Sequence, residues 1–121
     1  MRRLHEETKE HADFLLVYVR EAHAADEWVM PDNEAKGLSY EQPTSHAARI
    51  AAACRCTEDL RLPMPTVVDG LDDAVSKAYG AWPDRLYVIG PDGRVAYQGG
   101  VGPFGFKPAE VREFLRKAYG F

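Results

Sequence analysis

Residues 14–23 read FLLVYVREAH, and this stretch decides the fold. Its first part, residues 14–19, is an uncharged apolar run. The length of the run and its Val and Tyr content favour a strand buried on both faces. In open α/β sheets, ligands bind beyond the carboxyl ends of the strands. Glu21 and His23 directly follow the expected strand, so a carboxylate and an imidazole are the first candidates for chemistry.

The composition is that of one globular domain. The chain has 121 residues, of which 45% are hydrophobic, and its formal net charge is -4. This length suits one domain, and the charge argues against a nucleic-acid or polybasic membrane partner. No stretch resembles a secretory leader or an apolar span that could cross a bilayer, so we expect a soluble, cytoplasmic protein.

Strand and helix patterns alternate along the chain, which predicts an α/β domain with a mostly parallel sheet covered on both faces. A charged helical segment at 2–12 precedes the strand at 14–19, and a long polar connection at 24–44 follows it. The remaining expected elements are a helix at 44–60 capped by Thr44 or Ser45, a strand at 65–69, a helix at 72–79, strands at 86–89 and 95–98 joined by a hairpin, and a helix that starts at Pro108.

The last elements have the order of the thioredoxin-like fold, which ends in a β-hairpin and a helix. In that fold the proline before the hairpin is often cis, so we expect a cis bond before Pro83, although cis bonds are about 5% of X–Pro bonds.

Three motifs resemble those of the iodothyronine deiodinases. Residues 18–28 read YVREAHAADEW and resemble the family's Y-I-E-E-A-H-x-x-D-G-W. Residues 78–89 read AYGAWPDRLYVI and resemble A-Y-G-A-x-x-E-R-L-Y-V-I, and residues 97–103 read YQGGVGP and resemble Y-x-G-G-x-G-P. The motifs occur in the family's order over nearly the whole chain, so the sequence resembles a deiodinase of the bacterial type.

The resemblance implies a thioredoxin-like fold and reductive removal of iodine by a selenocysteine or cysteine. It implies a thiol co-substrate, an iodinated aromatic substrate and a homodimer, and neither a metal nor an organic cofactor. The family's nucleophile lies in a segment that would precede Met1. We therefore expect a single domain, 1–121, that is truncated at its N-terminus and inactive alone. The absent central strand would lie between the strands at 14–19 and 86–89.

The resemblance also implies roles for residues around the first strand. Glu21 and His23 correspond to family residues near the selenium that handle protons, since a histidine can protonate near neutral pH. The alternative for both is a solvated loop start. Tyr18 matches a family tyrosine near the site, although most strand tyrosines are core residues. Trp28 is either a wall of the substrate site or an anchor for its loop.

Two further residues are candidates for substrate binding. His46 lies at the start of the expected helix, where the family has a histidine that contacts the iodothyronine; the alternative is an exposed histidine near the cap. Arg85 matches the arginine of E-R-L-Y-V-I and could hold a substrate carboxylate with two hydrogen bonds. Its alternative is a surface ion pair with Asp84 or Asp69.

The two cysteines, Cys54 and Cys56, lie on the expected helix at 44–60, where Ile50, Cys54 and Leu60 recur among alanines. Two residues apart on a helix, the thiols point about 200° apart, so they cannot easily pair with each other. Their spacing does not suit a zinc site either. We expect buried small thiols; the alternative is a resolving thiol for an upstream nucleophile.

Two functions from different classes remain open. The first is a deiodinase-like oxidoreductase whose complete form carries a selenol or thiol. The second is a non-catalytic thioredoxin-like module that binds a protein or a small molecule.

Overall fold

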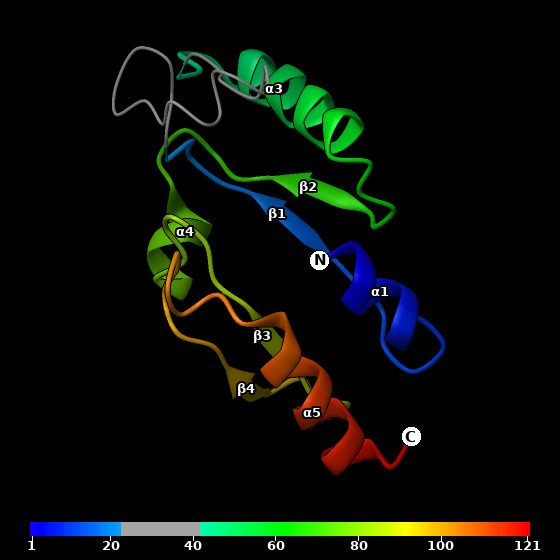
Figure 1. Ribbon diagram of the computed structural model, residues 1–121. Helices are drawn as coiled ribbons and strands as arrows, with labels where there is room; N and C mark the ends of the chain where they lie inside the picture. The colour runs from blue at the N-terminus through cyan, green and yellow to red at the C-terminus, as the bar shows by residue number, and fades with distance from the viewer. Residues whose placement is uncertain (23–41) are drawn as a thin grey trace.

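The computed structural model describes residues 1–22 and 42–121 (Figure 1). It confirms the expected order of helices and strands. Most elements begin or end one or two residues inside the predicted range. The elements are α1 (Arg2–Thr8), β1 (Leu16–Tyr18), α3 (His46–Asp59), β2 (Thr66–Val68), α4 (Ala74–Tyr79), β3 (Tyr87–Ile89), β4 (Val95–Gln98) and α5 (Pro108–Tyr119).

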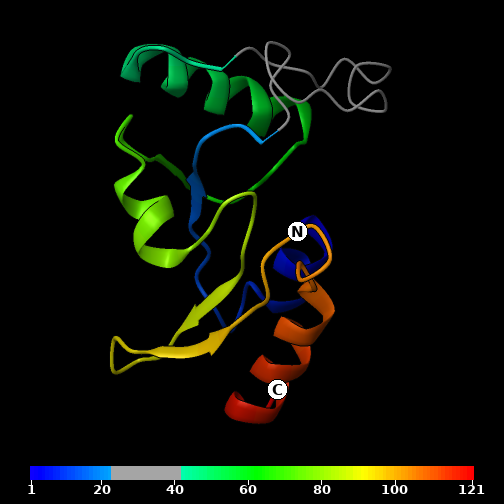
Figure 2. The same ribbon diagram turned by 90° about the vertical axis from the view of Figure 1, so that its left-hand side faces the viewer.

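The described strands form two ladders, one parallel and one antiparallel, and β1 and β3 do not pair, which agrees with the expected absence of a strand between them. β1 and β2 are parallel, with Leu16 opposite Thr66, and β3 and β4 are antiparallel. Within the described residues, β1 pairs only with β2, and β3 pairs only with β4. Figures 1 and 2 place β1, β2 and α3 in one half of the molecule, and the β3–β4 hairpin with α5 in the other.

One hydrophobic cluster joins α1 to α5. Leu4 of α1 and Val111 and Leu115 of α5 are buried, and apolar side chains of the hairpin pack against them. Pro108 occupies the first turn of α5, and Gly120 ends the helix in the left-handed conformation that glycine adopts without strain. The sequence therefore predicted the helix and its start at Pro108, and the structure shows that Val111 and Leu115 form its buried face.

A second cluster fixes α3 on the parallel pair. Tyr18 of β1 packs against Ala52 and Ala53, whose small side chains let the helix approach the strand closely. Ser45 caps α3, because its hydroxyl oxygen accepts a hydrogen bond from the backbone N–H of Ala48 at 3.1 Å. The expected apolar face was wrong: Ile50 and Leu60 are both exposed, and the buried face carries the alanines instead.

Candidate functional site

Tyr18 and Glu21 form a hydrogen-bonded pair at the carboxyl end of β1. The Tyr18 hydroxyl donates to Glu21 Oε2 at 2.9 Å. The tyrosine is 8% exposed and its ring packs in the α3 cluster, whereas Glu21 is half-buried. Tyr18 is thus a core residue that also reaches the candidate site, and the two sequence interpretations of it are compatible.

Gln42 holds the backbone of Glu21 in place. The N–H of Glu21 donates to Gln42 Oε1 at 3.3 Å, and Gln42 Nε2 donates to the carbonyl oxygen of Glu21 at 3.1 Å. A side-chain amide that satisfies both backbone groups of one residue restrains its position. Sequence reasoning missed Gln42, because no local pattern distinguishes it from other polar residues of the long connection.

Three other predicted site residues belong to this part of the chain, and the structure describes only His46 among them. His23 and Trp28 lie outside the described residues, so their proposed roles stay predictions. His46 is the first residue of α3, directly after its cap, and it is exposed. Its position agrees with the predicted helix start, and its role with substrate also stays a prediction.

Arg85 lies two residues before β3 and donates hydrogen bonds to two backbone carbonyls, one before it and one after it in the chain. Its Nε donates to the carbonyl oxygen of Gly99 at 2.8 Å, and its Nη1 donates to that of Gly80 at 3.3 Å. The guanidinium carbon lies 5.6 Å from the centre of the Tyr87 ring, within range of a cation–π contact. In the part of the chain that is described, Arg85 forms no ion pair with an aspartate, so that alternative was wrong.

Asp84 lies against the glycine-rich loop that follows β4. The N–H of Gly102 donates to the carbonyl oxygen of Asp84 at 2.9 Å, and a Cβ on Gly102 would lie 1.7 Å from Asp84 Oδ1. Only glycine fits there without a displacement. Burial raises the pKa of the Asp84 carboxyl. The peptide bond before the neighbouring Pro83 is cis, as expected, and so is the bond before Pro103.

Asp69 caps α4 from the end of β2. It is 2% exposed, and its carboxylate accepts hydrogen bonds from the backbone N–H groups of Gly70, Val75 and Ser76. Burial alone would raise the pKa of Asp69, but these N–H donors and the guanidinium of Arg49 outweigh it and hold the pKa below its usual range.

The cysteines differ from the expectation of two buried thiols. Cys54 is exposed, which contradicts it, and Cys56 is half-buried beside Tyr18. Both are free. Burial raises the pKa of the Cys56 thiol, and the carboxylates of Glu21 and Asp59 add to that shift. Cys56 is therefore mostly protonated near neutral pH, which makes it a slow nucleophile.

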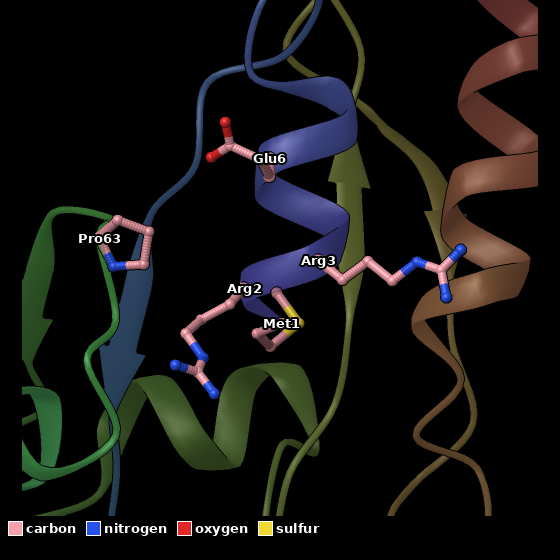
Figure 3. Close-up of a pocket in the computed structure, with 5 residues that line it drawn as sticks. All are labelled: Met1, Arg2, Arg3, Glu6 and Pro63. Carbon is pink, nitrogen blue, oxygen red and sulfur yellow. The ribbon is translucent and has the colours of Figure 1, made fainter.

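One open cavity lies away from these residues. It has a volume of about 590 Å³ and lies between the start of α1 and the turn before β2 (Figure 3). None of the residues that line it is a predicted site residue; they are Met1, Arg2, Arg3, Glu6 and Pro63.

The described ranges hold neither a cluster of metal ligands nor a membrane-spanning helix. In residues 1–22 and 42–121, no three His, Cys, Asp or Glu side chains are grouped so that they could hold a metal ion. Of the helices in those ranges, none combines the length and the apolar character that crossing a bilayer requires.

Comparison with known proteins identifies the family. The sequence profile for iodothyronine deiodinase matches residues 1–119. The type I iodothyronine deiodinase of Xenopus laevis is 42% identical over 106 residues, which are 88% of this chain and 40% of that protein. The thyroxine 5-deiodinase of Gallus gallus is 43% identical over 116 residues, covering 94% of this chain and 42% of that protein.

The human relative agrees with these two. The type II iodothyronine deiodinase of Homo sapiens is 36% identical over 120 residues, covering 98% of this chain and 44% of that protein. The chain thus spans less than half the length of these relatives. With the profile matching almost every residue, this chain belongs to the iodothyronine deiodinase family.

Proposed function

We propose that the full-length protein is a reductive dehalogenase of the thyroxine-deiodinase type, and that this chain supplies groups around the reacting atoms. The relatives that it matches are named iodothyronine and thyroxine deiodinases. The observation that carries the proposal is the hydrogen bond from Tyr18 to Glu21 at the carboxyl end of β1. Ligands bind at that end of the strands in open α/β sheets.

The proposed reaction exchanges iodine for hydrogen on an aromatic ring. The carbon–iodine bond breaks, a carbon–hydrogen bond forms, and iodide leaves. Two thiols, or a selenol and a thiol, give up two electrons and become a disulfide or a selenosulfide. One of their two protons is bound to carbon in the product and the other is released. The chain's part in this reaction is to transfer a proton and to hold the substrate.

Tyr18, Glu21 and His23 are the proposed proton-handling groups. The Tyr18 hydroxyl already donates to the Glu21 carboxylate, so a proton has a hydrogen-bonded path between the two. His23 is two residues further along the chain, and imidazole is the side chain that titrates closest to neutral pH. Gln42 restrains the Glu21 backbone and so keeps the carboxylate near the strand end.

His46, Trp28 and Arg85 are the proposed substrate contacts. Arg85 uses its Nε and Nη1 on backbone carbonyls, and no described residue accepts a hydrogen bond from its Nη2. A substrate carboxylate would therefore accept a hydrogen bond from Nη2, while the bonds from Nε and Nη1 to the protein hold the guanidinium in place. An arginine held in this way loses little side-chain entropy when it binds an anion.

We also propose that one further strand completes a thioredoxin-like sheet. The N–H of Leu16 donates to Pro65 and the carbonyl oxygen of Tyr18 accepts from Asp69, both toward β2. Because successive residues of a strand direct these groups to opposite edges, those of Val17 face away from β2. No described strand pairs with them, and unpaired buried backbone groups are unfavourable. A strand between β1 and β3 would pair with the edge of β1 that faces away from β2 and with the edge of β3 that faces away from β4.

The test measures iodide release by the full-length gene product with thyroxine and dithiothreitol. We expect iodide release that depends on the dithiol, and Glu21→Gln should lower the rate by about 10²–10⁴-fold, the usual contribution of general acid–base catalysis. The control is Glu6→Gln. It makes the same change at an exposed glutamate of α1, whose carboxylate pairs with Lys9.

Two results would overturn parts of the proposal. No iodide release by the full-length protein would leave the non-catalytic binding module as the function. If E21Q releases iodide as fast as the wild type, Glu21 does not handle the proton.

A further inference from the structure

Arg49 is a buried cation that joins two elements. It is 3% exposed on α3, and its Nη1 donates to the carbonyl oxygen of Gly70 at 2.6 Å and to Asp73 Oδ1 at 2.9 Å. A longer contact of 3.5 Å reaches the carbonyl oxygen of Asp69. A buried charge is unfavourable unless it is paired and hydrogen-bonded, so these acceptors hold Arg49 firmly against the turn between β2 and α4.

That turn is itself well fixed. The buried Asp69 carboxylate accepts three backbone N–H groups, two of them from α4. The acceptors of Arg49 therefore belong to a segment that cannot easily move toward or away from α3. Arg49 is only one turn from the start of α3, since its own N–H donates to the carbonyl oxygen of Ser45 at 3.0 Å. The contact thus fixes the N-terminal end of the helix.

The same end of α3 leads directly to the candidate site. Only Pro43 and Thr44 separate the cap residue Ser45 from Gln42, and a proline restricts both itself and the residue before it. Gln42 in turn holds the backbone N–H and C=O of Glu21. A short, stiff connection therefore runs from the turn after β2, through Arg49 and the start of α3, to Glu21.

We propose that Arg49 is a positioning residue for Glu21. It contacts neither Glu21 nor Tyr18 through a hydrogen bond in the described structure, and it acts by fixing the start of α3 and with it Gln42. The catalytic meaning of this positioning rests on the proposed function, which gives Glu21 its role. The positioning itself is a property of the fold and can be measured without substrate.

The experiment follows amide hydrogen exchange at Glu21 by NMR. We expect Arg49→Met to raise the exchange rate of this amide by about tenfold or more, because the hydrogen bond to Gln42 opens more often when charged contacts at the start of α3 are lost. Arg49→Lys should give a smaller increase, since an ammonium group reproduces the charge without the planar set of donors.

The matched control is Arg112→Met. Arg112 Nη1 pairs with Glu7 Oε2 at 3.0 Å and links α5 to α1, in the other half of the molecule. Within the described residues, Arg49 and Arg112 each have a buried Nε without a partner, so the two substitutions remove similar groups. R112M should leave the exchange of the Glu21 amide unchanged.

A double mutant separates positioning from a general loss of stability. Gln42→Leu removes the acceptor of the Glu21 N–H directly, so R49M should add little exchange at Glu21 in the Q42L background. If R49M and Q42L act additively, or if R112M raises the exchange as much as R49M, the proposal is wrong. Where R49M does not fold, Asp73→Asn removes the negative charge that pairs with Arg49 and must raise exchange at Glu21.

The outcomes of the two proposals are distinguishable. Deiodination could be absent while exchange at Glu21 still depends on Arg49, in which case the positioning holds and the proposed function fails. Deiodination with exchange that does not respond to R49M or D73N would leave the proposed function intact and refute the positioning.

Discussion

The replacement Asp69→Asn tests how much the turn after β2 contributes to the stability of the fold. The buried Asp69 carboxylate accepts N–H groups from Gly70 at 2.9 Å, Val75 at 3.1 Å and Ser76 at 2.8 Å. Asparagine keeps the shape but replaces one acceptor oxygen with a donor, so at least one buried N–H loses its partner. Because hydrogen bonds to a charged group contribute about 1.5–3 kcal/mol each, we expect D69N to lower the free energy of unfolding by about 2–4 kcal/mol.

Urea denaturation followed by circular dichroism at pH 7 measures this loss. The control is Asp72→Asn, which makes the same change three residues away at an exposed carboxylate that accepts a long hydrogen bond of 3.3 Å from the N–H of Ala74. D72N should change the free energy of unfolding by less than about 0.5 kcal/mol. Equal losses in D69N and D72N, or no loss in D69N, would refute the reasoning.

The same carboxylate makes stability depend on pH. The pKa of Asp69 is lower in the folded protein than in the unfolded chain, where an aspartate titrates near about 3.9. The stabilisation is therefore complete above that value and is lost as the pH falls through the folded pKa. The difference in unfolding free energy between wild type and D69N should be constant near neutral pH and should shrink below about pH 4.

Three further predictions concern other parts of the molecule. Tyr18→Phe removes the hydroxyl that donates to Glu21, so it should cost about 0.5–1.5 kcal/mol in urea denaturation and lower the rate of iodide release. Leu115→Ala opens a cavity in the α1–α5 cluster and should lower the free energy of unfolding by about 2–5 kcal/mol. Iodoacetamide should alkylate exposed Cys54 faster than Cys56, whose raised pKa keeps its thiol protonated, and mass spectrometry of the peptides would show the ratio.

Each of these predictions has an outcome that contradicts it. Unchanged iodide release in Y18F would remove Tyr18 from the proton path. Leu15→Ala is the control for L115A, because Leu15 is 63% exposed; a similar loss from both would mean that the α1–α5 cluster contributes no more than a surface residue. Faster labelling of Cys56 than of Cys54 at neutral pH would contradict the effect of burial on its thiol.

Much of the local structure could be predicted from the sequence. Pro108 predicted the start of α5, and the hydroxyl residues before a helical pattern predicted a cap at Thr44 or Ser45, of which the structure uses Ser45. These features depend on residues within one or two turns of each other. The predicted strand at 14–19 was longer than β1, because backbone pairing with β2 covers only residues 16–18; Leu15, expected to be buried, is exposed.

The contacts of the candidate site could be predicted only in part. The motif around Tyr18 and Glu21 indicated a site, and the structure joins those two side chains by a hydrogen bond. Nothing in the local pattern indicated that Arg49 is buried, because a charged residue on a helix is usually exposed. Its acceptors lie twenty or more residues away along the chain, and only the packing of α3 on the β2–α4 turn brings them together.

The sequence by itself determined which elements form, in what order, and to which family the chain belongs, since propensity, capping and motifs are recorded in neighbouring residues. The tertiary structure alone decided that Arg85 binds the carbonyls of Gly80 and Gly99, and that Gln42 holds Glu21. Such contacts join distant residues, and they form only where packed helices and strands bring a donor within about 3 Å of an acceptor.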